Sequence, residues 1–506
     1  MGQIFFNEDP NHFVFSRKKA GYEKITMQDA RDFIMQYKDT QITDFFVCLG
    51  ASSVWYDSAS ADNVVEKYKR WLAEGKTDEN ETNTVVSSVR LVKDFMETYG
   101  TSLQAVFIDT LREIDIHPWI SIRMNDIHEA SAEDSILFSD FFCKNRHKNR
   151  VSHRKPAGYY DYALDYLFPE VREYYLAVIG EALERFDTYG IELDFMREIY
   201  SIGVGREYEG IAVINTFMRD VYALVKKAEE RFFHPVKIAV RLPDTPEKAL
   251  RLGFDFFDWV KAGIVDHITV TPRWSSTDNH MPVDIWKKIL DGTGVTLAAG
   301  QEILIDAYNR RGRVLQYNTY ETAIATACAH HFEGADAIYL FNYMDMLVCE
   351  NDKDCSLCSD KDIYRKFLCT AGDYELCAAE KRRHVVTYDD VSAIGVPRQK
   401  QLPLLISAGE YASLRIATGK IGAQRRVSVV LGFDGDAYRA EDIAVYLNAK
   451  PCRLIGEQTP FAQQYPDMRY YCFEAENDGE LSPVCVIELG LADGRTVLHW
   501  AEIEID

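Results

Sequence analysis

The sequence predicts an α/β protein, a TIM (β/α)8 barrel, followed by an all-β sandwich domain. From about residue 40 to 345, short apolar runs alternate with amphipathic helical stretches, which is typical of a parallel α/β architecture. Past residue 375, short alternating strands separated by turn residues replace this pattern. A chain of 506 residues is long enough for two domains. We therefore expect the barrel over residues 1–375 and the sandwich over residues 376–506.

Seven apolar runs are predicted barrel strands. They cover residues 44–50, 117–124, 190–196, 237–242, 267–271, 295–300 and 335–341. We expect an eighth strand between residues 82 and 108, where helical and strand patterns are mixed, because eight βα units over this length are typical of a TIM barrel. A doubly wound sheet usually has a glycine-rich turn after its first strand, and the run 44–50 continues into Ala51-Ser52-Ser53 instead.

The carboxyl-terminal part contains seven short alternating runs between residues 404 and 500, with turns such as Asp478-Gly479 and Asp493-Gly494. Regular short strands of this kind predict a β-sandwich. Four aromatic residues of this domain are candidates for stacking on sugars, as in a carbohydrate-binding module: Tyr446, Tyr470, Tyr471 and Trp500. A structural lid packed on the barrel is the more frequent role for such a domain.

Composition excludes several classes of function. The net charge of -22 argues against a broad basic face for nucleic acid. No apolar run is long enough to span a bilayer, and the start of the chain lacks the basic and apolar sections of a signal peptide. We expect a cytoplasmic protein with no nucleic-acid or membrane partner; a secreted or periplasmic location is the alternative if a signal peptide has been removed. The oligomeric state is left open.

The eleven cysteines are odd in number and scattered, which suits reduced thiols better than a disulfide framework. Five of them cluster near the end of the barrel: Cys349, Cys355, Cys358, Cys369 and Cys377. A structural zinc usually needs two close pairs of ligands, and only Cys355 and Cys358 form one. We therefore expect neither a metal nor a cofactor.

The most informative stretch is the strand Gly190–Met196 with Arg197 after it. Side chains alternate in direction along a strand, so Ile191, Leu193 and Phe195 face the helices while Glu192 and Asp194 share the other face. Burial of a carboxylate is costly unless it is paired or used. The sequence therefore predicts a functional site here, although a buried polar network is the favoured interpretation for the deeper Glu192.

Reactive groups of TIM barrels lie at the carboxyl ends of the strands. The polar side chains expected there are Arg123, Asn125, Asp126 and His128, then Arg197, Arg241, Asp244, Thr271, Arg273 and Glu302. Asp194 and Glu302, on the fourth and seventh strands, make a carboxyl pair across the mouth, which is what cleavage of a glycosidic bond needs. His128 has two interpretations, a hydrogen-bonding loop histidine or a sugar ligand.

Other residues are predicted to hold the substrate. Trp55, Tyr56, Trp274 and Tyr343 are expected in loops at the mouth, where aromatic rings stack on sugars. Arg123, Asn125 and Arg241 are expected to bind hydroxyls, and the other candidate substrate ligands among the polar residues are Glu192, His128, Arg197 and Asp244. The basic run 144–155 favours a solvated loop, with an anionic sugar as the alternative partner.

Three phrases carry a family resemblance: Ser121–His128, Leu164–Tyr174 and Gly190–Arg197. With Phe254–Asp266 and Val445–Asn448, they resemble a group of bacterial glycoside-hydrolase-like proteins similar to family 10 glycosidases. The resemblance implies a TIM barrel followed by a β-sandwich and activity on carbohydrate.

In the true family 10 pattern the fourth strand ends in an Asn-Glu pair. This chain has Glu192-Leu193-Asp194 at that position instead. In other barrel glycosidases with an aspartate at this place, that aspartate is the nucleophile. The resemblance then leaves Glu302 or Asp244 as the acid.

The leading hypothesis is a glycoside hydrolase that cleaves an oligosaccharide or polysaccharide with the Asp194 and Glu302 carboxylates. A carbohydrate-binding protein with a degenerate barrel is a second hypothesis. A metal-dependent sugar isomerase or aldolase is a third, and it would need neighbouring acid and histidine ligands. Glu192, Asp194 and His267 are expected to lie too far apart around the ring for that.

Overall fold

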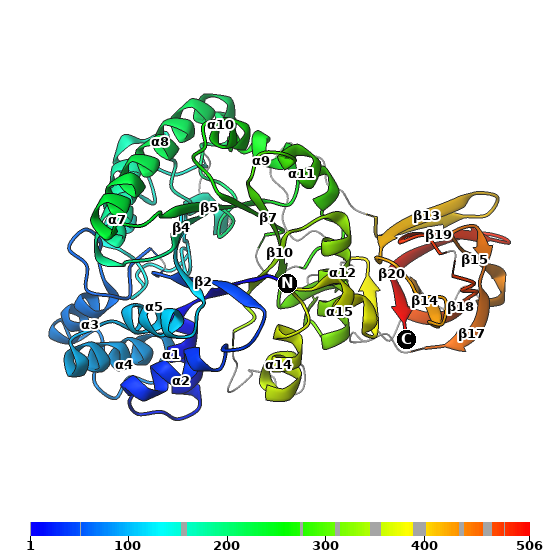
Figure 1. Ribbon diagram of the computed structural model, residues 1–506, viewed down its shortest axis with the longest axis horizontal. Coiled ribbons are helices and arrows are strands. Elements are labelled where there is room, and N and C mark those ends of the chain that lie inside the picture. Colours follow the sequence, from blue (N-terminus) through cyan, green and yellow to red (C-terminus); the bar gives the residue numbers. More distant parts are fainter. Residues whose placement is uncertain are drawn as a thin grey trace.

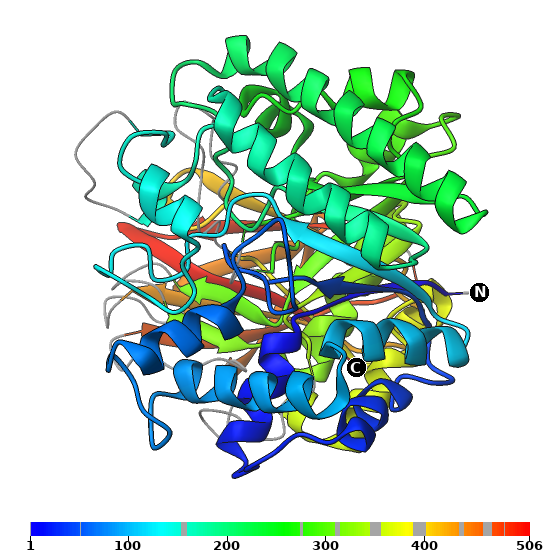
Figure 2. The same cartoon turned by 90° about the vertical axis from the view of Figure 1, so that its left-hand side faces the viewer.

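The structure is a computed structural model that describes residues 2–50, 52–152, 159–273, 277–308, 314–344, 356–387, 401–434, 440–458, 468–479 and 481–506. A closed parallel barrel is followed by two antiparallel sheets, so the predicted fold class is confirmed. Figure 1 shows the barrel with its ring of helices on one side and the sheets of the carboxyl-terminal domain on the other. In the view of Figure 2 the helices of the barrel lie in front of that domain.

Eight parallel strands close the barrel. They are β1 (Ile4–Glu8), β2 (Ile42–Cys48), β3 (His117–Arg123), β4 (Gly190–Asp194), β5 (Lys237–Pro243), β6 (His267–Thr271), β7 (Thr296–Glu302) and β10 (Ala337–Phe341). Each strand pairs with the next in this order, and β10 closes the ring on β1. Register partners followed once round the ring return to β1 about eight residues earlier, which is the stagger of TIM barrels.

Helices cover the outside of the barrel (Figure 1). They are α1 (Pro10–Lys19), α2 (Met27–Met35), α3 (Val64–Ala73), α4 (Thr84–Tyr99), α5 (Leu103–Glu113), α6 (Asp140–Asn145), α7 (Pro169–Arg185), α8 (Glu207–Phe232), α9 (Pro246–Arg251), α10 (Phe256–Lys261), α11 (Val283–Leu290), α12 (Tyr320–Glu333), α13 (Ser356–Ser359), α14 (Lys361–Leu368) and α15 (Tyr374–Ala379). Among the described residues, none of these helices is both long and apolar enough to cross a membrane.

The prediction of a strand between residues 82 and 108 is wrong. These residues form α4 and α5, and the missing strand is β1 at the start of the chain. Asn83 caps the first turn of α4, and Gly100, with φ of 65°, ends it in the left-handed conformation. The buried residues Val86, Val89 and Val92 recur at a helical spacing, so helix capping and periodicity both outweigh the β-branched composition.

The predicted alternation along β4 is confirmed. Ile191 and Leu193 pack in the core between the barrel and its helices, whereas Glu192 and Asp194 face the barrel interior and are buried there. A separate apolar cluster fills the barrel beside and below them; it consists of Phe5, Phe46, Trp119, Ala239, Ala298, Ala337, Tyr339 and Phe341. The interior is therefore a packed apolar core, with Glu192 and Asp194 against its upper part.

The carboxyl-terminal domain has two sheets with a shared core. The larger sheet contains β11 (Arg382–Val385), β12 (Leu404–Ser407), β14 (Val427–Asp434), β17 (Arg453–Glu457), β18 (Met468–Ala475) and β20 (Arg495–Ile505). The smaller sheet contains β13 (Tyr411–Ala417), β15 (Ile443–Leu447), β16 (Lys450–Pro451) and β19 (Val484–Leu491). Each of the seven predicted strands overlaps one of these elements, with Arg426 and Asn448 one residue outside β14 and β15.

Three of the four aromatic residues proposed for stacking on sugars are buried. Tyr470 and Tyr471 are each 4% exposed and Trp500 is fully buried, so only Tyr446 has a partly accessible ring. The barrel also contacts this domain through a hairpin of β8 (Leu304–Tyr308) and β9 (Val314–Tyr317). Helix α15 runs across the predicted division at residue 375, and the exact domain boundary stays a prediction.

We predict that Gly190→Ala destabilises the barrel. A Cβ at Gly190 would lie 2.2 Å from the Trp119 ring and 2.7 Å from the carbonyl oxygen of Lys237, and overpacking of this kind costs about 1–3 kcal/mol. Urea unfolding followed by tryptophan fluorescence measures the loss. Gly180→Ala in α7 is the matched control, because its nearest neighbours are Leu224 methyl groups at 3.7 Å, and equal or greater stability is expected there. Equal losses in both variants would contradict the prediction.

Candidate active site

Asp194, at the end of β4, is fixed by three donors. Its Oδ1 accepts the backbone N–H groups of Met196 at 2.8 Å and Arg197 at 3.0 Å, and its Oδ2 accepts from Arg241 Nη1 at 3.0 Å. The side chain is 1% exposed. Because all three contacts are donated to it, the carboxylate is held as an acceptor in one orientation at the inner edge of the barrel mouth.

Arg241 is the buried cation of the barrel interior. Its Nε donates to Thr271 Oγ1 at 3.2 Å, and its guanidinium carbon lies 3.9 Å from the centre of the Phe341 ring. Burial acts to lower the pKa of Arg241, but the negative charge of Asp194 beside it holds the pKa above its usual value. The guanidinium therefore keeps its charge inside the barrel, and removal of either partner of this ion pair would leave an uncompensated buried charge.

Glu192 lies two residues deeper on the same face of β4. It accepts hydrogen bonds from Ser121 Oγ at 2.9 Å and from the Tyr339 hydroxyl at 2.9 and 3.0 Å. Burial, and then the charge of Asp194, raise the pKa of Glu192 to about 8, although Arg241 acts in the opposite direction. Glu192 is thus protonated at neutral pH and belongs to a buried polar network, in agreement with the favoured interpretation of the sequence.

Glu302 ends β7 and faces the mouth. Asn342 Nδ2, which follows β10, donates to both carboxylate oxygens at 2.8 and 3.0 Å. Asn342 has φ of 60°, a left-handed conformation that asparagine tolerates better than most residues. The backbone carbonyl of Glu302 accepts from Thr277 Oγ1 and from Asn318 Nδ2. Both the side chain and the backbone of Glu302 are therefore held by neutral donors.

Asp194 and Glu302 lie at about the same height in the barrel. Along the register, Asp194 pairs through Arg241 and Thr269 with Ala298 on β7. Since the stagger of the barrel is about one residue per strand, the residue of β7 level with Asp194 is about three residues beyond Ala298, next to Glu302. The two predicted carboxylates thus face the mouth from strands separated by β5 and β6.

A second charged group surrounds the end of β3. Arg123 donates to Asp9 Oδ2 at 2.6 Å and to Asp126 Oδ2 at 3.0 Å. Asp126 Oδ1 lies 2.6 Å from His128 Nδ1, and Arg197 also contacts this histidine. Burial acts to raise the pKa of Asp126, but the neighbouring His128, Arg123 and Arg197 hold it well below its usual range. With a side chain 36% exposed, His128 is the most accessible member of this group.

Two acids of the site were missed by sequence reasoning. Asp9 directly follows β1. Because β1 was not predicted as a strand, Asp9 was not expected at the mouth of the barrel. Glu198 follows Arg197 in the loop after β4 and accepts from Arg273 Nη2 at 2.8 Å. Burial raises the pKa of Glu198, with Arg273 and Arg197 opposing it. The sequence signal for Glu198 was its place four residues beyond Asp194 in a loop already singled out.

Two predicted polar ligands have structural partners. Asn125 donates to the carbonyl oxygens of Leu164 at 2.8 Å and Tyr200 at 3.0 Å, which uses both amide hydrogens to join two loops. Asp244 Oδ1 forms an ion pair with Lys248 Nζ at 2.6 Å. Contacts of Asn125 and Asp244 with a substrate stay predictions.

The predicted stacking aromatics are not open at the mouth. Trp55 is 2% exposed and packs edge-on against Phe15, whereas Tyr56 and Tyr343 are fully buried. Tyr343 stacks on Phe367 with ring centres 5.3 Å apart. Their placement on an exposed rim is therefore corrected, because rings of this size gain more by joining the core. Trp274 lies outside the described residues.

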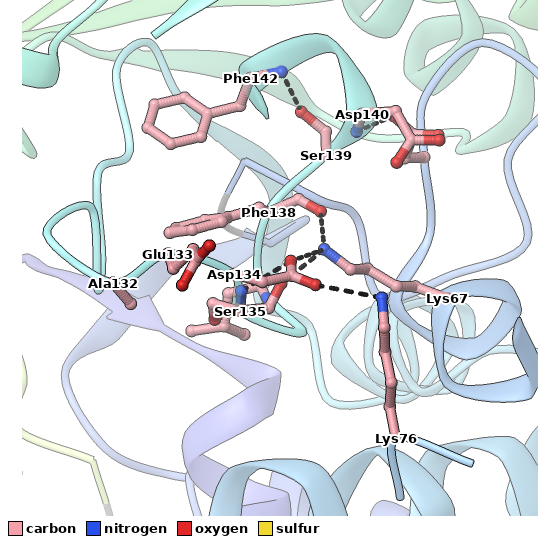
Figure 3. Close-up of polar contacts among 12 residues, drawn as sticks. Lys67, Lys76, Ala132, Glu133, Asp134, Ser135, Phe138, Ser139, Asp140 and Phe142 are labelled. Carbon is pink, nitrogen blue, oxygen red and sulfur yellow. Dashed lines mark hydrogen bonds and ion pairs between the residues drawn. The ribbon is translucent and has the colours of Figure 1, made fainter. Parts of the chain in front are cut away.

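The loop after β3, which carries His128, is anchored by a buried lysine of α3. Lys67 Nζ donates to the carbonyl oxygens of Ser135 at 2.5 Å and Phe138 at 2.8 Å and lies 3.3 Å from Asp134 Oδ1 (Figure 3). Arg146 donates to the carbonyl of Ala132 at 2.9 Å and is only 8% exposed. The favoured interpretation of the basic run 144–155 as solvated is therefore wrong for Arg146, which supports the same loop.

No group of three metal-ligating side chains is found among the described residues. Cys349 and Cys355 of the cysteine cluster lie outside those residues, and Cys358 and Cys377 are buried and donate to the carbonyl oxygens of Tyr343 and Thr370. Three cavities are lined by described residues: one between α1, α2 and α14, one beside α11 and β13, and one at the amino-terminal end of β3 and β5. Neither Asp194 nor Glu302 lines any of the three.

No protein-family model and no curated protein matches the sequence. Solved structures with a similar chain course include several glycoside hydrolases. The glycoside hydrolase domain of PgaB from Bordetella bronchiseptica is 10% identical, with a TM-score of 0.41, and 73% of this chain covers 99% of that domain. A chitinase from Bacillus thuringiensis is 9% identical, with a TM-score of 0.40 and coverage of 99% and 100%.

An α-L-fucosidase from Paenibacillus thiaminolyticus is 12% identical, with a TM-score of 0.40; the match covers 76% of this chain and 50% of the fucosidase. Similarity at this level transfers no activity or substrate to this protein. The functional conclusion therefore rests on the side chains of the barrel.

We predict that Glu192→Gln changes how stability depends on pH. Between about pH 4.5 and pH 8 the unfolded chain has lost the proton of Glu192 and the folded protein keeps it, so wild-type stability falls as pH rises. The variant lacks this loss, and its stability relative to wild type should rise by up to about 1.4 kcal/mol per pH unit across this window and then level off. Urea unfolding at a series of pH values measures it. Parallel pH profiles would contradict the protonated state of Glu192.

Proposed function

We propose that the protein is a glycoside hydrolase that cleaves an oligosaccharide or polysaccharide with two carboxyl groups, Asp194 and Glu302. The observation that carries the proposal is the pair itself: two inward carboxyl groups at about the same height, at the carboxyl ends of β4 and β7. Glycosidic cleavage needs one acid to protonate the leaving oxygen and a second carboxylate to attack the sugar or to activate water.

The roles follow from the partners of each group. Asp194 accepts three hydrogen bonds, one of them from a guanidinium, so it is suited to act as the carboxylate that stabilises or attacks the developing positive charge at the sugar. Asn342 orients the Glu302 carboxyl at the mouth, and we assign to Glu302 the transfer of a proton to the leaving oxygen. Asp244 is less suited to this role because its carboxyl is engaged in an ion pair with Lys248.

The surrounding charges are suited to hold the sugar. His128 and Asp9 are the more accessible groups of the cluster at the end of β3, with side chains 36% and 14% exposed. Imidazole and carboxylate groups bind sugar hydroxyls in complementary ways, as donor and acceptor. Arg123 and Arg197 fix both groups in place rather than contacting solvent themselves.

We predict that Asp194→Asn and Glu302→Gln each lower turnover by at least about 100-fold, since positioned acid–base groups supply about 10²–10⁴-fold. The measurement is sugar release from a panel of aryl glycosides, oligosaccharides and polysaccharides, with thermal unfolding as the check on folding. Asp187→Asn is the control, because its carboxyl pairs with His234 at the amino-terminal end of the strands, away from the mouth, and at most a small loss is expected. Full activity in either main variant would remove that residue from the mechanism. Saturable sugar binding without any release would favour a carbohydrate-binding protein.

A further inference from the structure

A hairpin that leaves the active site begins directly after Glu302. Strand β7 ends at Glu302, β8 begins at Leu304, and the chain returns along β9 to Asn318. Asn318 closes the base of the hairpin, because its backbone N–H donates to the Ile303 carbonyl at 2.8 Å and its side-chain amide donates to the Glu302 carbonyl at 2.9 Å. Movement of this hairpin would therefore move the backbone of Glu302.

The hairpin is seated on the carboxyl-terminal domain. Ile305, three residues beyond Glu302, is fully buried in an apolar cluster with side chains of β11, β14, β18 and β20: Val385, Val430, Met468, Tyr470, Cys472 and Trp500. These residues line the outer face of the larger sheet, since the inner face forms the shared core of the sandwich. This explains why Tyr470 and Trp500 are buried and not available for stacking on a sugar.

A second set of hydrogen bonds links Glu302 to the carboxyl-terminal domain. Thr277 donates its backbone N–H to the Leu304 carbonyl at 2.9 Å and its hydroxyl to the Glu302 carbonyl. Two residues later, Asn279 Nδ2 donates to the carbonyl oxygen of Val385 in β11 at 2.8 Å. The carbonyl of Glu302 is thus held by Thr277 and Asn318, and both belong to segments that contact the carboxyl-terminal domain or the hairpin seated on it.

We propose that the carboxyl-terminal domain positions Glu302 for catalysis, with Ile305 and Asn279 as positioning residues. The proposal rests on the proposed function of Glu302 as the acid. The outer face of the larger sheet then serves as part of the support of the active site, and the domain is required for the proton-transfer step in addition to stability. Ile487 of the smaller sheet packs in the shared core, on the opposite side of the larger sheet from Ile305, which provides a control.

The test is Ile305→Ala, with Ile487→Ala as the matched control. Both side chains are fully buried isoleucines, and Ile487 lies in the smaller sheet, away from the hairpin. Two substrates with the same sugar are compared, one with a poor leaving group and one dinitrophenyl glycoside whose leaving group needs little protonation. For Ile305→Ala we expect kcat on the poor leaving group to fall by about tenfold or more, with a similar KM, because small misplacement of a catalytic group costs this much.

On the dinitrophenyl glycoside the loss should be less than about threefold, since acid assistance matters little there. Ile487→Ala should reduce both rates equally or not at all. The proposal is wrong if the ratio of the two rates in Ile305→Ala equals the wild-type ratio. It is also wrong if that ratio changes by the same factor in Ile487→Ala. If Ile305→Ala does not fold, Ile305→Val and Asn279→Ala are measured in the same way.

Hydrogen exchange separates this proposal from the proposed function. In Ile305→Ala, peptides covering 277–279, 302–308 and 314–318 should exchange faster, and the other described parts of the barrel should be unchanged. Unchanged exchange in those peptides overturns the positioning role whatever the substrate. Faster exchange together with a wild-type protein that hydrolyses no glycoside would instead overturn the proposed function of Glu302.

Discussion

The structure depends on an ion pair enclosed in the barrel. Asp194 and Arg241 are each 1% exposed, and an unpaired charge in such a place would be too costly to keep. The surrounding residues meet this constraint: two backbone N–H groups and Thr271 complete the hydrogen bonds, and the Phe341 ring lies against the guanidinium. Glu192, directly below, stays protonated because a second anion at this depth would be unfavourable.

Much of the barrel was predictable because its strands are apolar runs with a simple alternation. The two faces of β4 and the inward direction of Glu302 follow from that alternation alone. Strand β1 was missed because only its first three residues, Ile4 to Phe6, are apolar and it leads at once into a helix capped by Asp9. With β1 absent from the prediction, one partner of Arg123 was absent too, since Asp9 is 114 residues away in sequence.

The predicted site residues fall into two groups: charged side chains that lie at the mouth and aromatic side chains that pack in the core. The charged residues Arg123, Asp194 and Arg241 are at the mouth because each finds an opposite charge there. The large aromatic residues Trp55 and Tyr343 were placed on the rim by their position after strands, and they pack inside instead. A sequence pattern locates the end of a strand, but it does not show whether a ring beside it turns to solvent or to a gap in the core. The same limit applies to Trp500, which supports the hairpin beyond Glu302.

We propose that a sugar is bound and cleaved between Asp194 and Glu302. The most direct measurement is the crystal structure of Asp194→Asn with the oligosaccharide that gives the largest thermal shift. We expect the glycosidic oxygen within hydrogen-bonding distance of the Glu302 carboxyl, with the sugar carbon it joins facing residue 194. An oligosaccharide bound only on the carboxyl-terminal sheets, or at the mouth with its glycosidic bond away from both residues, would contradict the proposal.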